Sequence, residues 1–407
     1  MAPTRWVIGL ASGSCADEAD AVLLAVEGVG LELRAEPVQV LHLPYGADLR
    51  DLIHHVETAG SCEVGQVGLL HRLLGETFAA AARGVADRAS MSLQLVQCVG
   101  CPGHLAWHDT DGRFPSTLGL GMAAVVAERT GVTTVSDFRD RDIAAGGQGV
   151  PLAALSDHLL FGDARESRVV IHLGGTARVV YMPAGGQLAD VVGFEPGPGN
   201  SLLDALVRLV TNGRECYDAG GRHAVQGKCI EPLLRGWLSH PYFQKRPPKT
   251  LPWRVFGEEF AAEAFRQARQ TDAGPHDLLC TATHFVARVI TTAVERFGPP
   301  DRPPQRVLLS GGGVRNGFLW RLLEQHFGNV AVERTDAWRI PAQVHQATAF
   351  GVLAALTLDG VAANVPSATG AAGPRLLGSL TPGSSSNWAR ALHWMAAQVA
   401  PPELALD

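Results

Sequence analysis

Cysteine, aromatic residues and blocks of like charge are all scarce in this 407-residue chain. The seven cysteines are an odd number and only Cys98 and Cys101 lie close in sequence, so we expect free thiols, as in a reducing cytoplasm. No apolar run approaches the ~20 residues of a membrane span, and the N-terminal stretch lacks the apolar core of a signal peptide. We therefore expect a cytoplasmic protein that is neither exported nor inserted into a membrane.

An excess of charge of one sign is also lacking. The 34 basic and 40 acidic residues give a net charge of -6 and are mixed along the chain, which argues against a nucleic acid or a membrane surface as a partner. Hydrophobic residues make up 46% of the chain, enough for a sizeable core. At ~150 residues per domain, the length predicts two or three domains.

Glycine is abundant: 46 Gly together with 25 Pro predict many tight turns. Between these turns the same order of elements occurs twice, with short antiparallel hairpins followed by amphipathic helices. The expected strands are 5–11, 20–26, 31–43, 168–173, 177–182 and 188–194, and the main helices are 64–88, 200–212, 276–297 and 317–327. This pattern predicts a mixed α/β protein with a duplicated core.

Four glycine turns lie at strand ends, at 12–18, 174–175, 195–200 and 311–313. Glycine lets several backbone N–H groups approach phosphate oxygens, and two of the turns precede helices, whose N-termini attract anions. We therefore predict nucleotide binding, although each glycine turn alone is also typical of an ordinary tight turn. The candidate phosphate-binding residues are Gly13, Ser14, Gly174, Gly175, Gly197, Gly199, Asn200, Gly311, Gly312, Gly313 and Asn316.

Two carboxylates accompany these turns. Asp17 lies at the first hairpin tip, where it could hold a Mg²⁺ ion that bridges phosphates, or could instead satisfy its own backbone. Glu195 lies where a strand ends beside a turn, a position that suits a general base in a cleft, although a lone turn glutamate is often only solvated.

The spacing Cys98-x2-Cys101-x2-His104-x3-His108 is similar to that of zinc ligands. A structural zinc site usually separates its two ligand pairs by a loop of about a dozen residues, whereas these four candidates crowd around a strand end and a proline. We adopt the simpler interpretation of two buried or turn thiols and two surface imidazoles.

At SDFRDRDIAAGGQGVPL, residues 136–152, the chain resembles the signature of the anhydro-N-acetylmuramic acid kinases. Other stretches agree in order and spacing, among them VIGLASGSCADEAD, TLGLGMAAVVAERTGV, VVGFEPGPGNSLLDALV, PYFQKRPPK, SGGGVRN and NVPSATGA. The resemblance implies an actin-like, Hsp70-like ATPase fold, a duplicated ribonuclease H-like α/β fold with ATP and sugar in a central cleft. We expect one lobe to comprise 1–142 plus about 368–407, and the other 143–367.

The resemblance also implies a reaction. A base activates water to attack C1 of a 1,6-anhydro sugar, and the released O6 takes the γ-phosphoryl group of ATP, with Mg²⁺ held at Asp17. Glu195 matches the base, and Asp137, Arg139 and Asp142 match the sugar-side motif, to which we add His104 and Gln346. Arg139 would pair with a substrate carboxylate, its alternative being a salt bridge to a neighbouring aspartate. Such sugars come from peptidoglycan recycling, and family members are commonly homodimers.

Five positions depart from the family's motifs. They are Glu18 for the glycine of S-G-T-S-x-D-G, Glu195 for the aspartate of D-T-G-P-G-N, Pro102 within G-S-H-G-Q-T, Arg178 for the asparagine of G-G-x-A-N, and Gln346 for a glutamate before A-x-A-F. We expect Glu18 to repel phosphates unless it turns away or binds magnesium. A base displaced by ~1 Å can lose ~10²-fold in rate. Two alternatives therefore stand: a homologue with a changed acceptor or chemistry, and a non-catalytic sugar- or nucleotide-binding pseudokinase.

Overall fold

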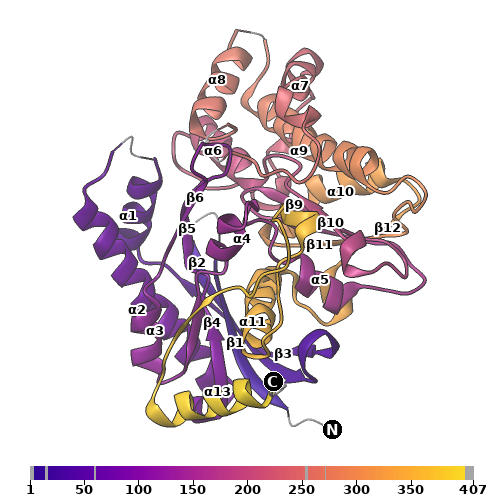
Figure 1. The fold of residues 1–407 in the computed structure, drawn as a ribbon. Helices are drawn as coiled ribbons and strands as arrows, with labels where there is room; N and C mark the ends of the chain where they lie inside the picture. The colour runs from indigo at the N-terminus through magenta and orange to yellow at the C-terminus, as the bar shows by residue number, and fades with distance from the viewer. Residues whose placement is uncertain (1–3, 14–16, 59–60, 253–254, 271, 399–407) are drawn as a thin grey trace.

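The computed structural model describes residues 4–13, 17–58, 61–252, 255–270 and 272–398. Its framework is two mixed sheets, the first coloured indigo to purple except for its yellow edge strand β13, and the second pink to orange in Figure 1. The first sheet has the order β13-β7-β4-β1-β2-β3, and its strands are β1 (Arg5–Ser12), β2 (Glu18–Glu27), β3 (Arg34–Pro44), β4 (Val96–Gly100), β7 (Thr134–Ser136) and β13 (Ser379–Thr381). The opening strands β1, β2 and β3 form the expected antiparallel meander.

The second sheet repeats this plan in the order β10-β9-β8-β11-β12. Its strands are β8 (Arg168–Leu173), β9 (Ala177–Met182), β10 (Val192–Phe194), β11 (Arg306–Ser310) and β12 (Ala331–Arg334). In each sheet an antiparallel pair of hairpins is followed by parallel strands, because β4 joins β1, and β11 joins β8, in parallel. The predicted duplicated α/β fold is therefore confirmed.

Thirteen helices of the described residues surround the sheets, and a separate hairpin of β5 (His104–Asp109) and β6 (Ser116–Leu120) projects from the first lobe. The helices are α1 (Ala47–Thr58), α2 (Val64–Arg88), α3 (Ala123–Thr130), α4 (Asp140–Ala144), α5 (Ala154–Phe161), α6 (Asn200–Val210), α7 (Glu231–Leu238), α8 (Glu258–Ala268), α9 (Pro275–Phe297), α10 (Gly317–Phe327), α11 (His345–Leu358), α12 (Pro366–Thr369) and α13 (Ser385–Gln398). Across the described ranges, no helix combines the length and the apolarity that crossing a bilayer requires.

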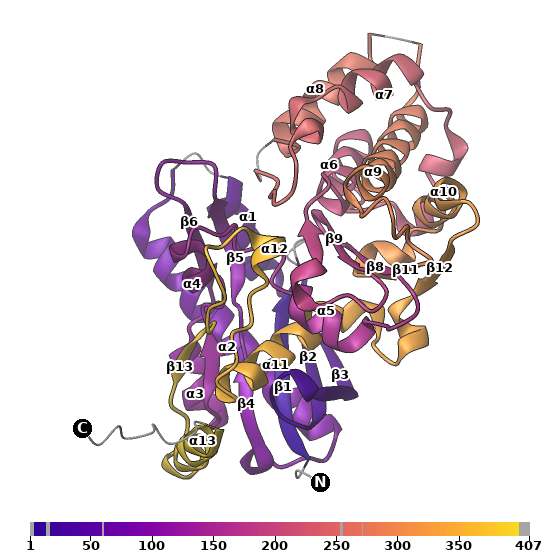
Figure 2. The same ribbon diagram turned by 45° about the vertical axis from the view of Figure 1, so that its right-hand side comes forward.

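Helix α11 lies between the two sheets and packs against β1, β2 and β4 (Figures 1 and 2). Its almost wholly apolar sequence suits this position, since it is buried on all sides. Close contact with β1 depends on Gly9, where a Cβ atom would lie 2.0 Å from the carbonyl oxygen of Ala347. The helix begins with His345, which is buried, and Gln346, which is partly exposed, at the junction of the lobes.

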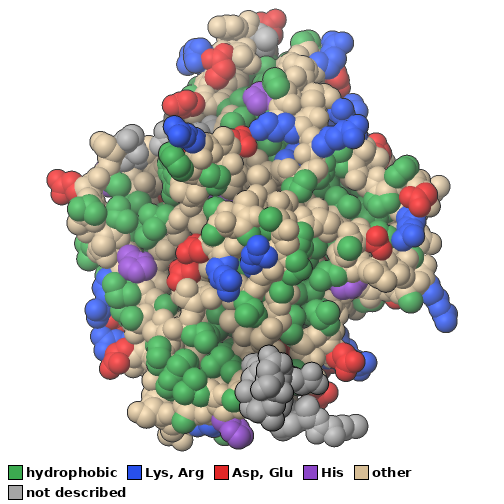
Figure 3. All heavy atoms as spheres, viewed as in Figure 1, with side chains coloured by type: hydrophobic (Ala, Val, Ile, Leu, Met, Phe, Trp, Pro, Cys, Tyr) green, Lys and Arg blue, Asp and Glu red, His purple; other side chains and the backbone are tan. Residues whose placement is uncertain are grey.

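Three apolar clusters make up the core. One joins the first sheet to α2, one joins both sheets to α11 and α5, and one joins the second sheet to α6 and α9. Charged side chains of both signs are interspersed over both lobes on the face seen in Figure 3. The clusters account for the hydrophobic composition and hold the lobes together along α11.

Two strand predictions began too early. The expected strand 31–43 begins only at Arg34, because Gly30–Glu32 forms a 3₁₀ turn. Only Val192–Phe194 of the expected strand 188–194 pairs with β9, because Leu188–Asp190 forms a 3₁₀ turn. The Asp190 carboxylate closes this turn by accepting a hydrogen bond from the backbone N–H of Gln187 at 2.9 Å. The short polar side chain thus competes with the strand for the backbone.

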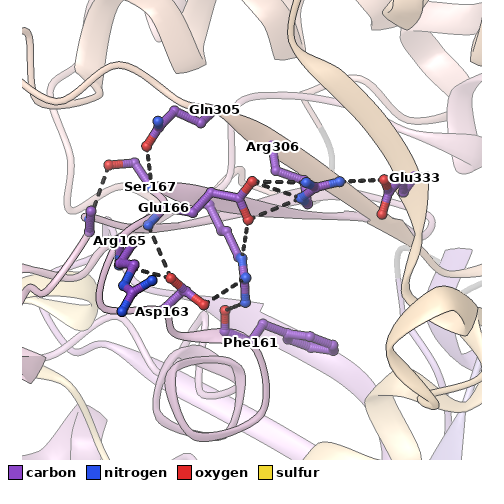
Figure 4. A network of polar contacts seen from close by, with 10 residues as sticks. Phe161, Asp163, Arg165, Glu166, Ser167, Gln305, Arg306 and Glu333 are labelled. Atoms are coloured by element: carbon purple, nitrogen blue, oxygen red, sulfur yellow. Dashed lines mark hydrogen bonds and ion pairs between the residues drawn. The ribbon is translucent and has the colours of Figure 1, made fainter.

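A network of charges fixes the start of β8 and β11, at the opposite end of these parallel strands from their glycine turns (Figure 4). Arg168 donates to Glu166 at 2.7 Å and to Asp163 at 2.9 Å, and its guanidinium lies 4.0 Å from the ring centre of Trp338. Arg306 donates to Glu166 at 3.0 Å. The network is structural, since none of these residues lines the central cleft.

Candidate active site

A cleft of ≈ 760 Å³ opens between the lobes. The first lobe supplies side chains from α1 and β5, and the second from α6 and the start of α8, which face each other in Figure 2. The lining brings together residues singled out from the sequence, among them Asp17, His104, Arg139, Gly175, Arg178, Glu195 and Gln346. Residues that are far apart in sequence thus meet in one cavity.

Glu195 lines the cleft while remaining 96% buried, since only 4% of its surface is exposed. One carboxylate oxygen, Oε2, accepts a hydrogen bond from the backbone N–H of Leu251 at 2.9 Å. The other, Oε1, accepts one from Nε of Arg178 at 3.2 Å. Burial raises the pKa of Glu195 above its ordinary value, and Arg178 opposes that rise. Glu195 is therefore a fixed carboxylate with the raised pKa expected of a general base.

Arg139 projects into the same cleft from the turn before α4, where Asp137 adopts a left-handed backbone with φ 53°. The Arg139 side chain is 7% exposed, its Nε has no hydrogen-bond partner, and it makes no ion pair among the described residues. The alternative of a salt bridge to a neighbouring aspartate is therefore not what the structure shows. Burial and the charge of Arg178 lower the pKa of Arg139 to about 10. A buried, unpaired guanidinium in a cleft is a site for an anion.

Asp17 and Glu18 take different directions at the first hairpin tip. Asp17 lines the cleft. Glu18 points instead to His42 on the neighbouring strand β3, where 3.5 Å separates its carboxylate oxygen from Nδ1 of the imidazole. His42 is also 2.5 Å from Asp20, and these two carboxylates raise the pKa of His42 to about 9. The protonated imidazole offsets the charge of Glu18, which reduces the repulsion of phosphates expected from the sequence.

His104 lies within a chain of polar contacts on the first lobe. Its Nδ1 is 2.7 Å from Oγ of Ser12, and its Nε2 is 2.8 Å from a carboxylate oxygen of Glu57. Ser12 in turn accepts a hydrogen bond from the hydroxyl of Tyr45 at 2.8 Å. Both ring nitrogens are occupied, so the imidazole is held in one orientation at the wall of the cleft.

The glycine turns of the second lobe form one connected structure. The backbone N–H groups of Gly199 and Asn200 donate to the carbonyls of Gly175 and Gly174, at 2.9 and 2.8 Å. These bonds dock the β8–β9 hairpin onto the N-terminus of α6. A Cβ atom at Gly199 would lie 2.4 Å from the Gly174 oxygen, so the docking requires glycine there. Gly197 takes part by accepting from Ala177 at 3.2 Å.

The third glycine turn follows the neighbouring parallel strand β11. Gly311 has φ 83° and donates to the carbonyl of Ala342, while Gly313 packs on Leu173 at the end of β8. No heavy atom lies within 4 Å of the position a Cβ atom would take at Gly312, so this backbone is open. Asn316 caps α10 by accepting from the N–H of Leu319 at 3.0 Å. The turns at 174–175, 197–200 and 311–313 thus lie together at one end of the second sheet.

Asp137 and Asp142 do not line the cleft, and of the predicted phosphate-binding residues that the structure describes only Gly175 does. Asp142 is fully buried, and its carboxylate accepts from the N–H of Gly149, the hydroxyl of Thr369 and the amide of Asn364 at 2.7 to 2.8 Å. Asp137 is exposed, accepts from Ser136 at 2.7 Å and is not part of the cleft lining. Ser14 falls outside the described residues.

The zinc-like spacing does not assemble a metal site. Cys98 and Cys101 are fully buried on opposite faces of the first sheet, where burial raises the pKa of each thiol to about 12. His104 and His108, however, are 2% and 7% exposed, so their interpretation as surface imidazoles was wrong. Both lie on β5, on the same buried face of the strand as Ala106.

Sequence reasoning missed the partner of Glu195. In the sequence Arg178 stands out only as a departure from a motif, yet in the structure it pairs with the predicted base. The register of the β9–β10 hairpin ends with Val179 opposite Phe194, and Arg178 and Glu195 each lie one position beyond that pair. Opposite charges at facing positions of two hairpin strands are a signal that a register prediction could have used.

Comparison with known proteins extends these observations to the whole chain. A family model described as anhydro-N-acetylmuramic acid kinase matches residues 5–383. Curated proteins of that name are 32% identical in Caldanaerobacter subterraneus subsp. tengcongensis, 36% in Acaryochloris marina and 37% in Gloeobacter violaceus. The matches cover 93%, 92% and 94% of this chain and 97%, 99% and 100% of those relatives, respectively. The similarity therefore includes both lobes and all of the cleft.

Proposed function

Because the chain belongs to the anhydro-N-acetylmuramic acid kinase family, we propose that it is an ATP-dependent kinase that opens a 1,6-anhydro sugar and phosphorylates it at O6. The observation that carries this proposal is Glu195, a buried carboxylate with a raised pKa that faces the cleft with both oxygens fixed. The substrate we propose is 1,6-anhydro-N-acetylmuramic acid, whose lactyl carboxylate suits the unpaired guanidinium of Arg139.

Glu195 acts on water in this proposal. It takes a proton from a water molecule, whose oxygen forms a bond to C1 as the C1–O6 bond breaks. The freed O6 attacks the γ-phosphorus of ATP, the bond between that phosphorus and the bridging oxygen breaks, and ADP leaves. His104 and Gln346 line the same cleft and would orient sugar hydroxyl groups.

The glycine turns fit a triphosphate. The backbone N–H groups of Gly199 and Asn200 are used in docking the β8–β9 hairpin onto α6. A Cβ atom at Gly312, by contrast, would have no neighbour within 4 Å, so the backbone there has room for a phosphate. Asp17 offers a cleft-facing carboxylate, the hard oxygen ligand that Mg²⁺ prefers. Bound there, Mg²⁺ would neutralise phosphate charge.

We extend the proposal to organisation and setting. We propose that one lobe comprises 1–142 plus about 368–407, and its support is a first sheet built from strands within 5–136 and at 379–381. The other lobe would comprise 143–367, and its support is a second sheet built from strands within 168–334. Residues 399–407 lie outside the described residues. Six free cysteines support a reducing cytoplasm, where the enzyme would serve peptidoglycan recycling. The family resemblance supports a homodimer, which light scattering would measure.

Turnover by Glu195 variants tests the proposal. Purified protein is mixed with ATP, Mg²⁺ and 1,6-anhydro-N-acetylmuramic acid, and sugar 6-phosphate is quantified by mass spectrometry. We expect product from the wild type and a loss of ~10²–10⁴-fold in kcat for Glu195→Gln, because the base is removed. Glu263→Gln, at a partly exposed position on α8 away from the cleft, is the matched control. Absence of product from folded wild-type protein that binds ATP and sugar would refute the proposal.

A further inference from the structure

Arg178 and Glu195 form a buried ion pair at the wall of the cleft. The contact joins Nε of Arg178 to Oε1 of Glu195 at 3.2 Å, and the side chains are 18% and 5% exposed. Each of the two residues lies one position beyond Val179–Phe194, the last pair of the β9–β10 register. The hairpin therefore brings the two side chains close to each other at its end.

The rest of the glutamate is held by a second segment. Oε2 accepts from the N–H of Leu251, the backbone N–H of Glu195 donates to the carbonyl of Lys249 at 3.0 Å, and the hydroxyl of Tyr242 donates to the Glu195 carbonyl at 2.6 Å. Within the described part of the chain, Arg178 is the one cation in hydrogen-bonding distance of the carboxylate. The backbone contacts fix the position of Glu195, and Arg178 orients the oxygen Oε1 and favours the ionised form of the carboxylate.

Other titratable groups surround this pair. Arg139 approaches from the first lobe and also lowers the pKa of Glu195, though less than Arg178 does. The two arginines, together with burial, lower the pKa of His108 to about 4, so this imidazole is neutral near pH 7. Lys249 directs its ammonium group into the rings of Tyr242 and Phe297, 4.6 and 4.9 Å from their centres. The carboxylate therefore depends chiefly on Arg178 for its ionised form.

We propose that Arg178 is a positioning residue, which fixes the Glu195 carboxylate and keeps it ionised so that it can accept the proton of the attacking water. This inference rests on the proposed function. A glutamate buried to this degree without a cation would take up a proton and lose its capacity as a base. A guanidinium on the hairpin strand avoids that outcome while leaving carboxylate lone pairs free for water.

Arg178 also lines the cleft, so a different role is to bind an anionic group of the substrate. The two roles predict different defects. Loss of a positioning residue moves the acidic limb of the pH profile and lowers kcat, whereas loss of a substrate anchor raises KM and leaves the limb in place.

The test measures kcat and KM against pH for wild type, Arg178→Gln and Arg178→Lys. We expect Arg178→Gln to move the acidic limb of kcat/KM upward by about 1–3 pH units and to lower kcat, because an adjacent arginine typically depresses a carboxyl pKa by that amount. Arg178→Lys keeps the charge and should restore most of the limb position. Arg266→Gln, which breaks the exposed Arg266–Glu263 pair on α8, is the matched control and should leave the profile unchanged.

A second measurement needs no turnover. The ionisation of Glu195 is followed by carbon-13 NMR of protein labelled at the glutamate carboxyl, with the signal assigned by its loss in Glu195→Gln. A higher Glu195 pKa in folded Arg178→Gln than in wild type supports the inference even if the proposed sugar is not turned over. An unchanged Glu195 pKa overturns it, as does an active Arg178→Gln enzyme whose defect lies in KM alone.

Discussion

Replacing Gly199 by alanine should weaken nucleotide binding, because this glycine docks the β8–β9 hairpin onto α6. The added Cβ atom would lie 2.4 Å from the Gly174 oxygen and 3.0 Å from the Gly175 oxygen. Since unstrained contacts lie near ~3.5 Å, the hairpin tip must move by ~1 Å. That shift breaks the bonds of 2.9 and 2.8 Å by which Gly199 and Asn200 hold these carbonyls.

The expected magnitude follows from this geometry. Overpacking of this kind costs ~1–3 kcal/mol of folding free energy. Each hydrogen bond to a charged phosphate that is lost costs ~1.5–3 kcal/mol, so the affinity for ATP should fall ~10–100-fold per bond.

Gly312→Ala is the matched control, since a Cβ atom there has no neighbour within 4 Å. Its folding stability should equal that of wild type, and any loss of ATP affinity would show that the phosphates approach Gly312 itself. Urea denaturation measures the first quantity, and calorimetry with Mg²⁺ and ATP the second. Wild-type ATP affinity in Gly199→Ala would refute the assignment of this turn to the nucleotide.

Three further predictions concern buried groups. Arg5→Met should destabilise the protein by ~3–5 kcal/mol in urea denaturation, because it leaves Asp359 buried without the guanidinium that now donates to it at 2.6 and 3.0 Å; Asp359→Asn in the same background should recover part of this loss. Burial lowers the pKa of His108 to about 4 in the folded protein, below its ordinary 6.5, so the neutral imidazole contributes its full share of folding stability above pH 6.5. About 3 kcal/mol of that folding free energy is lost as the pH falls to 4, and the folding stability of His108→Gln should fall less over the same pH series. Cys98 and Cys101, with pKa values of about 12, should resist alkylation in the native protein while exposed thiols react, as peptide mass spectrometry would show; rapid labelling of either would contradict their burial.

Much of the fold could be predicted because the local signals were strong. The helix at 64–88 and the strands at 168–173 and 177–182 have the predicted bounds, since apolar periodicity and glycine turns agree there. The strand at 188–194 is shorter because the Asp190 carboxylate accepts a hydrogen bond from the N–H of Gln187, which apolar periodicity does not register.

The sequence predicts which residues reach the cleft, but it does not predict which side chains they contact there. Glu195, Asp17 and Arg139 reach the cleft as the family motifs implied. Asp142 shares a motif with Arg139, yet its partners Asn364 and Thr369 are more than 200 positions away, so no local pattern reveals that its carboxylate is enclosed. Glu18 likewise depends on a neighbouring strand for the imidazole that offsets its charge.

The central claim is that water attack at C1 and phosphoryl transfer to O6 occur in one site around Glu195. A single turnover in ¹⁸O-labelled water, quenched rapidly and examined by mass spectrometry, tests it most directly. We predict sugar 6-phosphate with ¹⁸O at C1, an unlabelled phosphoryl group and one ADP for each product. Label in inorganic phosphate with the anhydro sugar unchanged would contradict the claim, since it would mean that water attacks ATP instead of the sugar.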